Sequence, residues 1–175
     1  AAHAASVMIA QTSFDLAQFK QVLHKNAVLI HEQGCSVTEP LLRTYNGDRP
    51  LEVAWVGRCI ASKGLPLLLK AMASRICRDH VRLHVAGDGL ERKTWEKNVI
   101  AQGLARSVIW HGWLEEEEVT ELMLHCDVMC VSSLLEATSA SVMHALGLGL
   151  PIICLRHCGC GDVVDGTCGI AIEVG

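Results

Sequence analysis

The chain of 175 residues has few aromatic side chains, few charged ones and no apolar run long enough to cross a membrane. Aromatic residues make up 4% of the sequence and charged residues 19%, whereas 50% of the residues are hydrophobic. A core with so few rings must be largely aliphatic, which is typical of a parallel sheet that helices cover on both faces. The longest apolar stretch, residues 145–155, contains two glycines and a proline and is too short to span a bilayer.

Lysine and arginine form no cluster, and the net charge is −4, so the composition disfavours a general nucleic-acid binder. Cysteine is abundant, with nine residues but no C-x-x-C pair. Several cysteines fall inside predicted strands or helices, so we expect a reduced, cytosolic chain with buried thiols. His157, Cys158 and Cys160, with Cys168 beyond them, lack the spacing of a common zinc module. The sequence therefore predicts no metal site.

From residue 51 onward, strand and helix patterns alternate along the chain. Such alternation with apolar strands predicts a Rossmann-like α/β fold, an open parallel sheet with helices on both faces and right-handed crossovers. The predicted strands are 51–57, 81–86, 107–111, 127–131, 151–155 and 169–173, and the predicted helices are 63–75, 90–102, 115–124 and 139–147. The G-x-G-x-x-G fingerprint is missing after the first of these strands, which disfavours hydride transfer.

The stretch 131–155 carries the clearest functional signal. It predicts a buried strand, a short loop with the carboxylate of Glu136, an amphipathic helix, a glycine turn and a second buried strand. Glu136 lies at the carboxyl end of the first strand, where open α/β sheets bind ligands. Thr138, Ser139 and Ser141 follow, and such side chains cap helices whose free N–H groups face an anion. The stretch predicts a site for a small, negatively charged ligand.

A second segment, residues 51–72, predicts the same kind of site. Its strand ends in Gly57 and Arg58, and its helix begins near Lys63 with Ser62 as the expected N-cap. Two cations and a helix dipole then converge on one junction, which favours a diphosphate as the ligand. The alternative is a pair of solvated surface cations, but two segments with the same layout favour a binding site.

Two other groups of ionisable residues receive structural interpretations. The run Glu115–Glu118 is expected to start a helix and to be stabilised by the helix dipole, not to form an acid/base pair. His111 and His125 are isolated histidines near apolar strands, and we interpret them as structural residues and not as ligands.

Together, these segments resemble the carboxyl-terminal half of the family 4 glycosyltransferases, retaining enzymes with two Rossmann-like domains in the GT-B arrangement. The order and spacing of the matching segments hold from about residue 51 to the end. The segments that carry the resemblance are Val56-Gly57-Arg58 with Lys63-Gly64, Val85-Ala-Gly87-Asp88-Gly89, Val108-Ile-Trp-His-Gly112-Trp113, Cys126-Asp127-Val128, Ser132-Ser-Leu-Leu-Glu136, Ala145-Leu-Gly-Leu-Gly149-Leu-Pro151, Gly159-Cys-Gly161-Asp162-Val-Val and Gly169-Ile-Ala-Ile.

The resemblance implies a role for each site residue. Arg58 and Lys63 would clamp the donor diphosphate, and Glu136, the first glutamate of the family's paired motif, would hold a hydroxyl of the donor sugar. These three are the candidate catalytic residues. Trp113 and Leu114 match the loop that cradles the base, although Trp113 equally fits simple surface packing. The other candidate substrate-binding residues are Gly57, Gly87, Thr138, Ser139, Ala140, Ser141 and His144. Family members work without a metal or another cofactor, and their donor is a UDP- or GDP-sugar.

The sequence departs from the family pattern at His144. The family's second glutamate falls eight positions after the first and grips the ribose hydroxyls, and here that position is His144. A neutral imidazole can accept one hydrogen bond but cannot bridge two hydroxyls. The departure implies either weaker nucleotide binding or an inactive relative. The segment Ala137-Thr138-Ser139-Ala140 also replaces the commoner Gly-Phe-Gly type, although its backbone N–H groups can still face a phosphate.

The resemblance also implies a domain organisation. Residues 1–50, with predicted elements at 7–10, 14–23 and 27–30, would be the tail of the acceptor domain and the interdomain linker. Residues 51–175 would be the donor-binding domain, incomplete at its carboxyl end.

The chain does not begin with methionine, so we expect a fragment or a processed product. The implied reaction transfers a glycosyl group from the nucleotide-sugar to an acceptor hydroxyl with retention. The implied partners are the nucleotide-sugar donor and a glycan or lipid-linked acceptor, which the missing amino-terminal domain would bind, and no nucleic acid. The implied location is the cytoplasm, with peripheral association of the full-length protein at the inner face of a membrane. A non-catalytic nucleotide-sugar-binding relative, acting as a scaffold or regulator, and a sugar-nucleotide epimerase are the alternative interpretations.

Overall fold

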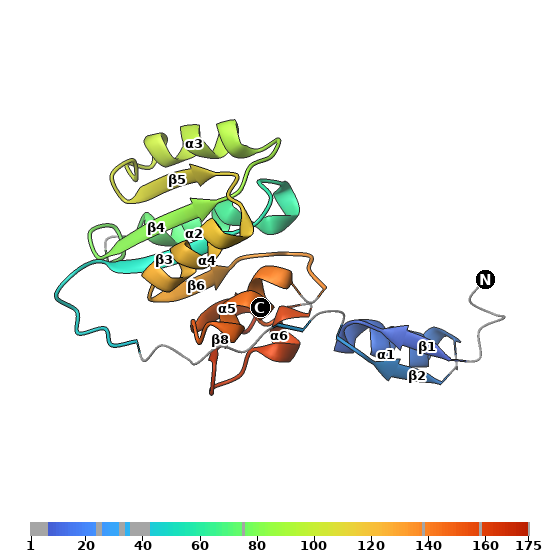
Figure 1. The fold of residues 1–175 in the computed structure, drawn as a ribbon. Helices are drawn as coiled ribbons and strands as arrows, with labels where there is room; N and C mark the ends of the chain where they lie inside the picture. The colour runs from blue at the N-terminus through green and yellow to red at the C-terminus, as the bar shows by residue number, and fades with distance from the viewer. Residues whose placement is uncertain are drawn as a thin grey trace.

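The main body of the protein is a six-stranded parallel sheet with helices on both faces (Figure 1). The structure is a computed structural model that describes residues 7–23, 26–31, 34–35, 43–74, 76–137, 139–157 and 159–174. The strands stand in the order β5-β4-β3-β6-β7-β8. Their bounds are β3 Leu51–Val56, β4 Val81–Ala86, β5 Val108–Gly112, β6 Val128–Val131, β7 Ile152–Leu155 and β8 Gly169–Ile172. The Rossmann-like sheet predicted from the alternation of elements is confirmed.

The helices divide between the two faces of this sheet. Side chains alternate along a strand, so neighbouring residues pack into opposite layers. Val53, Trp55 and Leu83 pack with α2 (Leu65–Met72) and α3 (Arg92–Ala101), whereas Ala54 and Ala86 pack with the opposite layer. That second layer contains α4 (Glu116–His125), α5 (Ala140–Gly147) and the short α6 (Cys160–Val163). Both cores are largely aliphatic, as the scarcity of rings predicts.

The start of the helix after β3 differs from the prediction. Ser62 is not its N-cap, because it lies in the short 3-10 turn Ala61–Lys63 and Gly64 occupies the N-cap of α2 instead. Gly64 has a φ of 62°, and Pro66 stands in the first turn of α2, where a missing N–H costs nothing. The helix therefore restarts after the glycine. Helix α6 was not predicted, since a single turn of four residues leaves almost no periodic signal.

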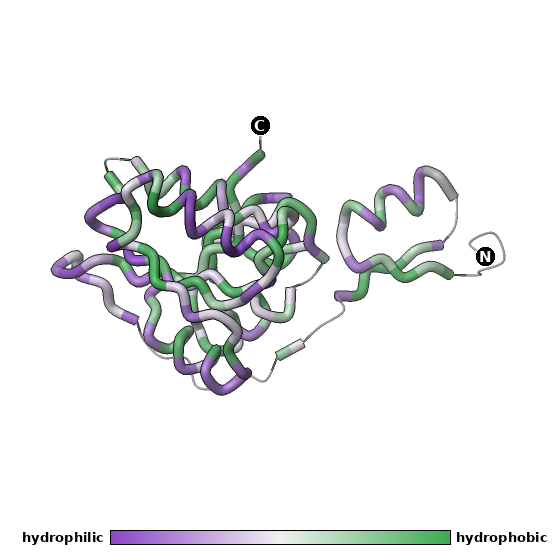
Figure 2. The backbone as a smooth tube through the Cα atoms, turned by 90° about the horizontal axis from the view of Figure 1, so that it is seen from above, coloured by the Kyte–Doolittle hydropathy of each residue, from purple (hydrophilic) through white to green (hydrophobic). Residues whose placement is uncertain are grey.

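A small unit at the amino terminus lies beside the main body (Figures 1 and 2). It consists of β1 (Met8–Ala10), α1 (Ser13–Leu23) and β2 (Ala27–Leu29), and its two strands pair in parallel. The backbone N–H and hydroxyl of Ser13 donate to the carboxylate of Asp162 in α6, at 2.7 and 2.5 Å. These contacts join the unit to the carboxyl edge of the main sheet. Within the described ranges, no helix has the length and apolarity that a membrane span requires.

Candidate functional site

The residues predicted to bind a diphosphate meet at the point where the strand order reverses. The chain passes from β3 outward to β5 and then returns to β6 beside β3, and ligands bind at the carboxyl ends of strands at such a point. The loops after β3 and β6 line a cleft of about 690 Å³ there. Its lining residues are Thr12, Phe14, Asp15, Arg58, Ile60, Ser62, Lys63, Leu135, Glu136, Ala137 and His157. The three candidate catalytic residues therefore share one cleft, which also receives side chains from the amino-terminal unit.

Lys63 and Glu136 form an ion pair in this cleft. The ammonium Nζ of Lys63 contacts Oε2 of Glu136, and only 18% and 14% of the two side chains are exposed. Arg58, in contrast, is exposed and forms no ion pair with any residue that the structure describes. The cleft thus holds one neutralised cation and one cation that is available to an anionic ligand.

Two buried serines fix the geometry of this pair. The indole Nε1 of Trp55 donates to Oγ of Ser132 at 3.1 Å, and the Ser132 hydroxyl donates to the carbonyl oxygen of Lys63 at 3.0 Å. The Ser133 hydroxyl donates to Oε2 of Glu136 at 3.2 Å. Ser132 and Ser133 were not predicted as site residues. The only signal in the sequence was two hydroxyl residues directly after an apolar strand.

Close backbone packing explains one glycine at the same edge. Gly87, directly after β4, has a φ of 139°, and a Cβ built on it would lie 1.9 Å from the carbonyl oxygen of Gly57. Its N–H donates to the carbonyl oxygen of Gly112 at 2.6 Å. Gly57 and Gly87, both predicted as site residues, therefore lie next to each other where the central strands end. Gly87 holds the backbones together there.

A second cleft, of about 660 Å³, lies on the α4 and α5 side of the same edge. It is lined by Gly34, Cys35, Leu114, Glu116, Val119, Thr120, Ala140, Ser141, His144 and Leu148. Here Nε2 of His144 lies 3.0 Å from the hydroxyl oxygen of Thr120, and that hydroxyl donates to the carbonyl oxygen of Glu116 at 2.8 Å. With the Thr120 proton directed to Glu116, the tautomer of His144 that completes this pair carries its proton on Nε2. The Nδ1 atom then carries the lone pair.

The remaining predicted site residues fall into different places. Leu114, Ala140, Ser141 and His144 line the second cleft. Trp113 is 69% exposed and is not among the lining residues of either cleft. Ser139 occupies the N-cap position of α5, but its hydroxyl bonds to that of Ser141 at 2.9 Å and not to the helix backbone. Thr138 and Cys158 lie outside the described residues.

The expectation for the glutamate run is confirmed, whereas that for the histidines is wrong in one respect. Glu115 and Glu118 form a reciprocal capping box at the start of α4. His111 is not isolated, because its Nε2 lies 2.9 Å from Nδ1 of the buried His84. Burial lowers the pKa of His111, and the neighbouring His84 adds to that effect. The ring of His125 stands edge-on to that of His84, with centroids 6.0 Å apart.

Comparison with known proteins places this arrangement in a family. An uncharacterized glycosyltransferase of Methanocaldococcus jannaschii is 26% identical over 101 residues, 58% of this chain and 26% of that protein. The α-D-kanosaminyltransferase of Streptomyces kanamyceticus is 29% identical over 128 residues, 71% of this chain and 33% of that protein. The crystal structure of Anabaena HepE in complex with UDP superposes with a TM-score of 0.79 at 22% identity, over 98% of this chain and 50% of that one.

The chain spans about a quarter to a third of the length of these curated relatives. The structural likeness, at 22% identity, supports the same Rossmann-like fold. The sequence from residue 50 to residue 175 matches the family described as glycosyl transferases group 1, and this match covers most of the chain. The protein therefore belongs to the group 1 glycosyl transferases.

Proposed function

We propose that this chain supplies the nucleotide-sugar-binding domain of a retaining glycosyltransferase. The observation that carries the proposal is the convergence of Arg58, Lys63 and Glu136 at the carboxyl ends of β3 and β6. The neighbour HepE was solved with UDP bound, which supports a nucleoside diphosphate as the ligand. The reaction is the transfer of a glycosyl group from a UDP- or GDP-type donor to an acceptor hydroxyl. The retaining outcome rests on the resemblance to family 4.

The two clefts suggest how such a donor would lie. The second cleft, with Leu114 and His144, suits the base and ribose, and the first, with Arg58 and Glu136, suits the diphosphate and sugar. Ala137 lines the first cleft and Ala140 lines the second, and Ala140 begins α5, whose first N–H groups can bind phosphate. The donor would therefore cross the amino end of α5.

Lys63 and Glu136 form an ion pair with each other and can exchange it for contacts with a donor. When a diphosphate binds, Lys63 can move to a phosphate oxygen while Glu136 accepts a hydrogen bond from a sugar hydroxyl. Arg58 offers a planar fork that binds phosphate oxygens in a bidentate way. As the sugar leaves, charge develops on the diphosphate, and the two cations would stabilise that charge. The proposal therefore needs no bound metal or other cofactor.

The proposal for acceptor binding concerns the whole protein and not this chain alone. Thr12, Phe14 and Asp15 of the amino-terminal unit line the first cleft together with Glu136. This unit would be the end of an acceptor-binding domain that holds a glycan or a lipid-linked glycan. Peripheral membrane association and a cytoplasmic location of the full-length protein are parts of the same proposal.

Titration of UDP, GDP and ADP against the purified chain, by calorimetry, tests the proposal. Replacing Arg58 and Lys63 together with alanine should weaken binding of the preferred nucleotide by more than about 100-fold, because each charge-assisted contact is worth about 1.5–3 kcal/mol. The matched control replaces Lys70 and Arg106, two exposed cations outside both clefts, and it should bind like the parent. If the Arg58/Lys63 variant binds as well as this control, the diphosphate clamp is wrong.

The non-catalytic alternative is favoured by one observation, the presence of His144 in the second cleft. Extending the chain upstream and assaying transfer from a radiolabelled donor separates the two functions. Transfer supports the enzyme, whereas tight nucleotide binding without transfer supports a scaffold or regulatory role.

A further inference from the structure

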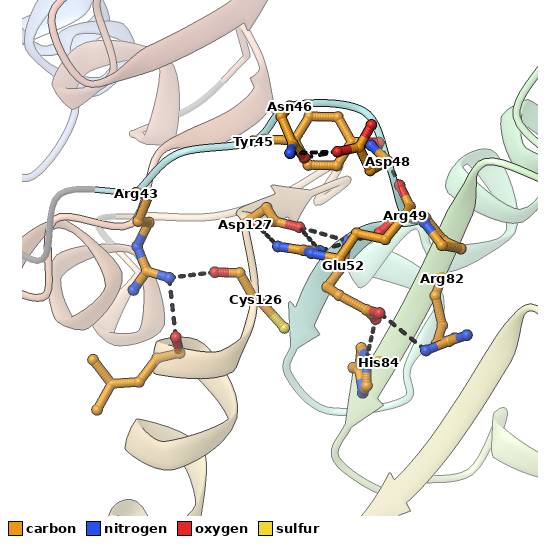
Figure 3. A network of polar contacts seen from close by, with 12 residues as sticks. Arg43, Tyr45, Asn46, Asp48, Arg49, Glu52, Arg82, His84, Cys126 and Asp127 are labelled. Carbon is orange, nitrogen blue, oxygen red and sulfur yellow. Dashed lines mark hydrogen bonds and ion pairs between the residues drawn. The ribbon is translucent and has the colours of Figure 1, made fainter.

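A cluster of metal-binding side chains lies between β3, β4 and the end of α4, apart from the donor site. Glu52 of β3 and His84 of β4 are almost fully buried, with 8% and 7% of their side chains exposed. His125 ends α4 and packs against His84 from the same face of the sheet. Figure 3 shows Glu52 between His84 and Arg82. Burying a carboxylate and an imidazole together is costly unless both have strong partners.

The ligand atoms of this cluster already point toward one another. Oε2 of Glu52 lies 2.8 Å from Nε2 of His84. One ligand atom from each of Glu52, His84 and His125 lies within 4.8 Å of the other two. The ligand atoms of a tetrahedral zinc ion stand about 3.3 Å apart when its bonds are about 2.0 Å long. His125 is exposed at the end of its helix, so a change of side-chain rotamer can bring its ring to that spacing.

We propose that Glu52, His84 and His125 form a zinc site with water as the fourth ligand. Two imidazoles and one carboxylate make a set that Zn²⁺ accepts, whereas Mg²⁺ and Ca²⁺ prefer oxygen ligands alone.

The surroundings of the three ligands fit this assignment. Metal-bound histidines donate their second N–H to a neighbouring acceptor, which orients the ring. Nδ1 of His84 lies 2.9 Å from Nε2 of His111, so this ring nitrogen of His111 is placed to accept that proton. Arg82 donates to Oε1 of Glu52 at 3.0 Å and leaves Oε2 on the side of His84. His111 and Arg82 are therefore positioning residues for the site.

The position of the site indicates a structural or regulatory role. Glu52 is the second residue of β3, and Arg58 comes six positions later, just after the strand ends, so the two are up to about 20 Å apart along the chain. A bound zinc ion would fasten the last turn of α4 to β3 and β4. Helix α4 also carries Glu116 and Thr120 in the second cleft, so the ion would stabilise the element that positions His144. Since zinc would bind the folded chain, it should raise stability.

Zinc binding to the untagged 175-residue chain is tested by calorimetry with ZnCl₂ and with MgCl₂ as the comparison. We expect binding of one zinc ion, no response to magnesium, and a rise in the thermal unfolding midpoint. His125→Ala should weaken zinc binding at least about 100-fold, and His111→Ala about 10- to 100-fold, as for other ligands and their supporting residues. The matched control is His80→Ala, an exposed histidine outside the cluster, which should bind like the parent.

Two results would overturn the site. The first is that the variants His125→Ala and Glu52→Gln bind zinc with the same affinity as the control His80→Ala. The second is a cobalt(II)-substituted protein whose near-ultraviolet spectrum shows thiolate-to-cobalt charge transfer, because that band would assign the metal to cysteines. A cobalt spectrum without the thiolate band, lost in His125→Ala, supports the site. Neither outcome depends on nucleotide binding, so the test is independent of the proposed function.

Discussion

The side chain of His144 determines how the nucleoside end of the donor can be held. Its Nε2–H is committed to Thr120, whose own proton goes to the carbonyl oxygen of Glu116. These two hydrogen bonds leave Nδ1 of His144 as a single acceptor at the second cleft. One acceptor can bind one ribose hydroxyl, whereas the carboxylate of the resembled family binds two.

Replacing His144 with glutamate should therefore strengthen binding of a ribonucleoside diphosphate by about 1–2 kcal/mol, the value of an added charged acceptor. The gain should be smaller for the 2′-deoxy nucleotide, since one of the two hydroxyls is then missing. Calorimetry with UDP and dUDP measures both effects, and His80→Glu controls for the added negative charge. No gain, or an equal gain for both nucleotides, would favour the scaffold interpretation, with Glu136 acting only as a helix-terminal anion.

Cys59 is a buried thiol whose burial lowers its reactivity, although the residue before it is exposed. It follows the exposed Arg58 directly, yet it is fully buried. Burial raises the pKa of the Cys59 thiol to about 11, and the carboxylate of Asp88 adds to the shift. The thiolate, which is the reactive form, is therefore scarce at neutral pH.

Iodoacetamide should alkylate Cys59 at pH 8 at least about 100-fold more slowly than the exposed Cys35, because a free thiol has a pKa of about 8.5. Below pH 11 the rate at Cys59 should rise about tenfold for each pH unit, since the raised pKa keeps the group protonated over that whole range. Peptide mass spectrometry at pH 7, 8 and 9 follows both sites. Equal rates at Cys59 and Cys35 would show that the loop after β3 opens in solution.

At the scale of elements, the loops after β3 and β6 are held together by backbone packing. Gly64 has a φ of 62°, and a Cβ added to it would lie 2.1 Å from the carbonyl oxygen of Ser132. The N–H of Leu134 donates to the carbonyl oxygen of Ser62 at 2.8 Å in the same region. The contact fixes the positions of Lys63 and Glu136 relative to each other.

Gly64→Ala should destabilise the fold by at least about 2 kcal/mol, since it combines left-handed backbone strain with a steric clash. Gly103→Ala is the matched control: Gly103 has a φ of 71°, but nothing lies within 4 Å of its added Cβ. That variant should lose only about 1 kcal/mol, the cost of the strain alone. Urea unfolding of the two variants separates the clash from the strain. Equal losses would mean that the two loops move apart easily.

The helices and strands also show most clearly which features can be predicted from the sequence and which cannot. The six strands of the main sheet and the helices α2 to α5 follow from the period of their apolar residues, and Arg58 and Glu136 follow from their places at strand ends. Ser62 was misassigned because the left-handed Gly64 divides one apparent helix into two turns. The cluster of Glu52, His84 and His125 was not predicted, because its members come from three separate elements. No local spacing in the sequence indicates that these three residues lie together.

At the scale of the whole molecule, stability resides in the six-stranded unit. Among the described residues, the buried members of both core clusters come from residues 53–164 and none from the amino-terminal unit. That unit meets the main body through exposed hydrogen bonds between Ser13 and Asp162, and exposed contacts of this kind add little. Arg43 donates to the carbonyl oxygens of Leu124 and Cys126 at the end of α4, which ties residue 43 to the main body.

A shortened chain that begins at residue 43 should therefore fold and unfold cooperatively, with a urea midpoint close to that of the parent. Its m value should be slightly smaller, because less surface becomes exposed on unfolding. Asp162→Ala in the full chain is the control, since it removes the two hydrogen bonds but no residues, and its midpoint should also stay unchanged. Nucleotide affinity should persist in the shortened chain, because Arg58, Lys63 and Glu136 remain, and the loss of Asp15 removes a negative charge from the first cleft. A broad transition or a large drop in midpoint would instead show that the amino-terminal unit forms part of the cooperative core.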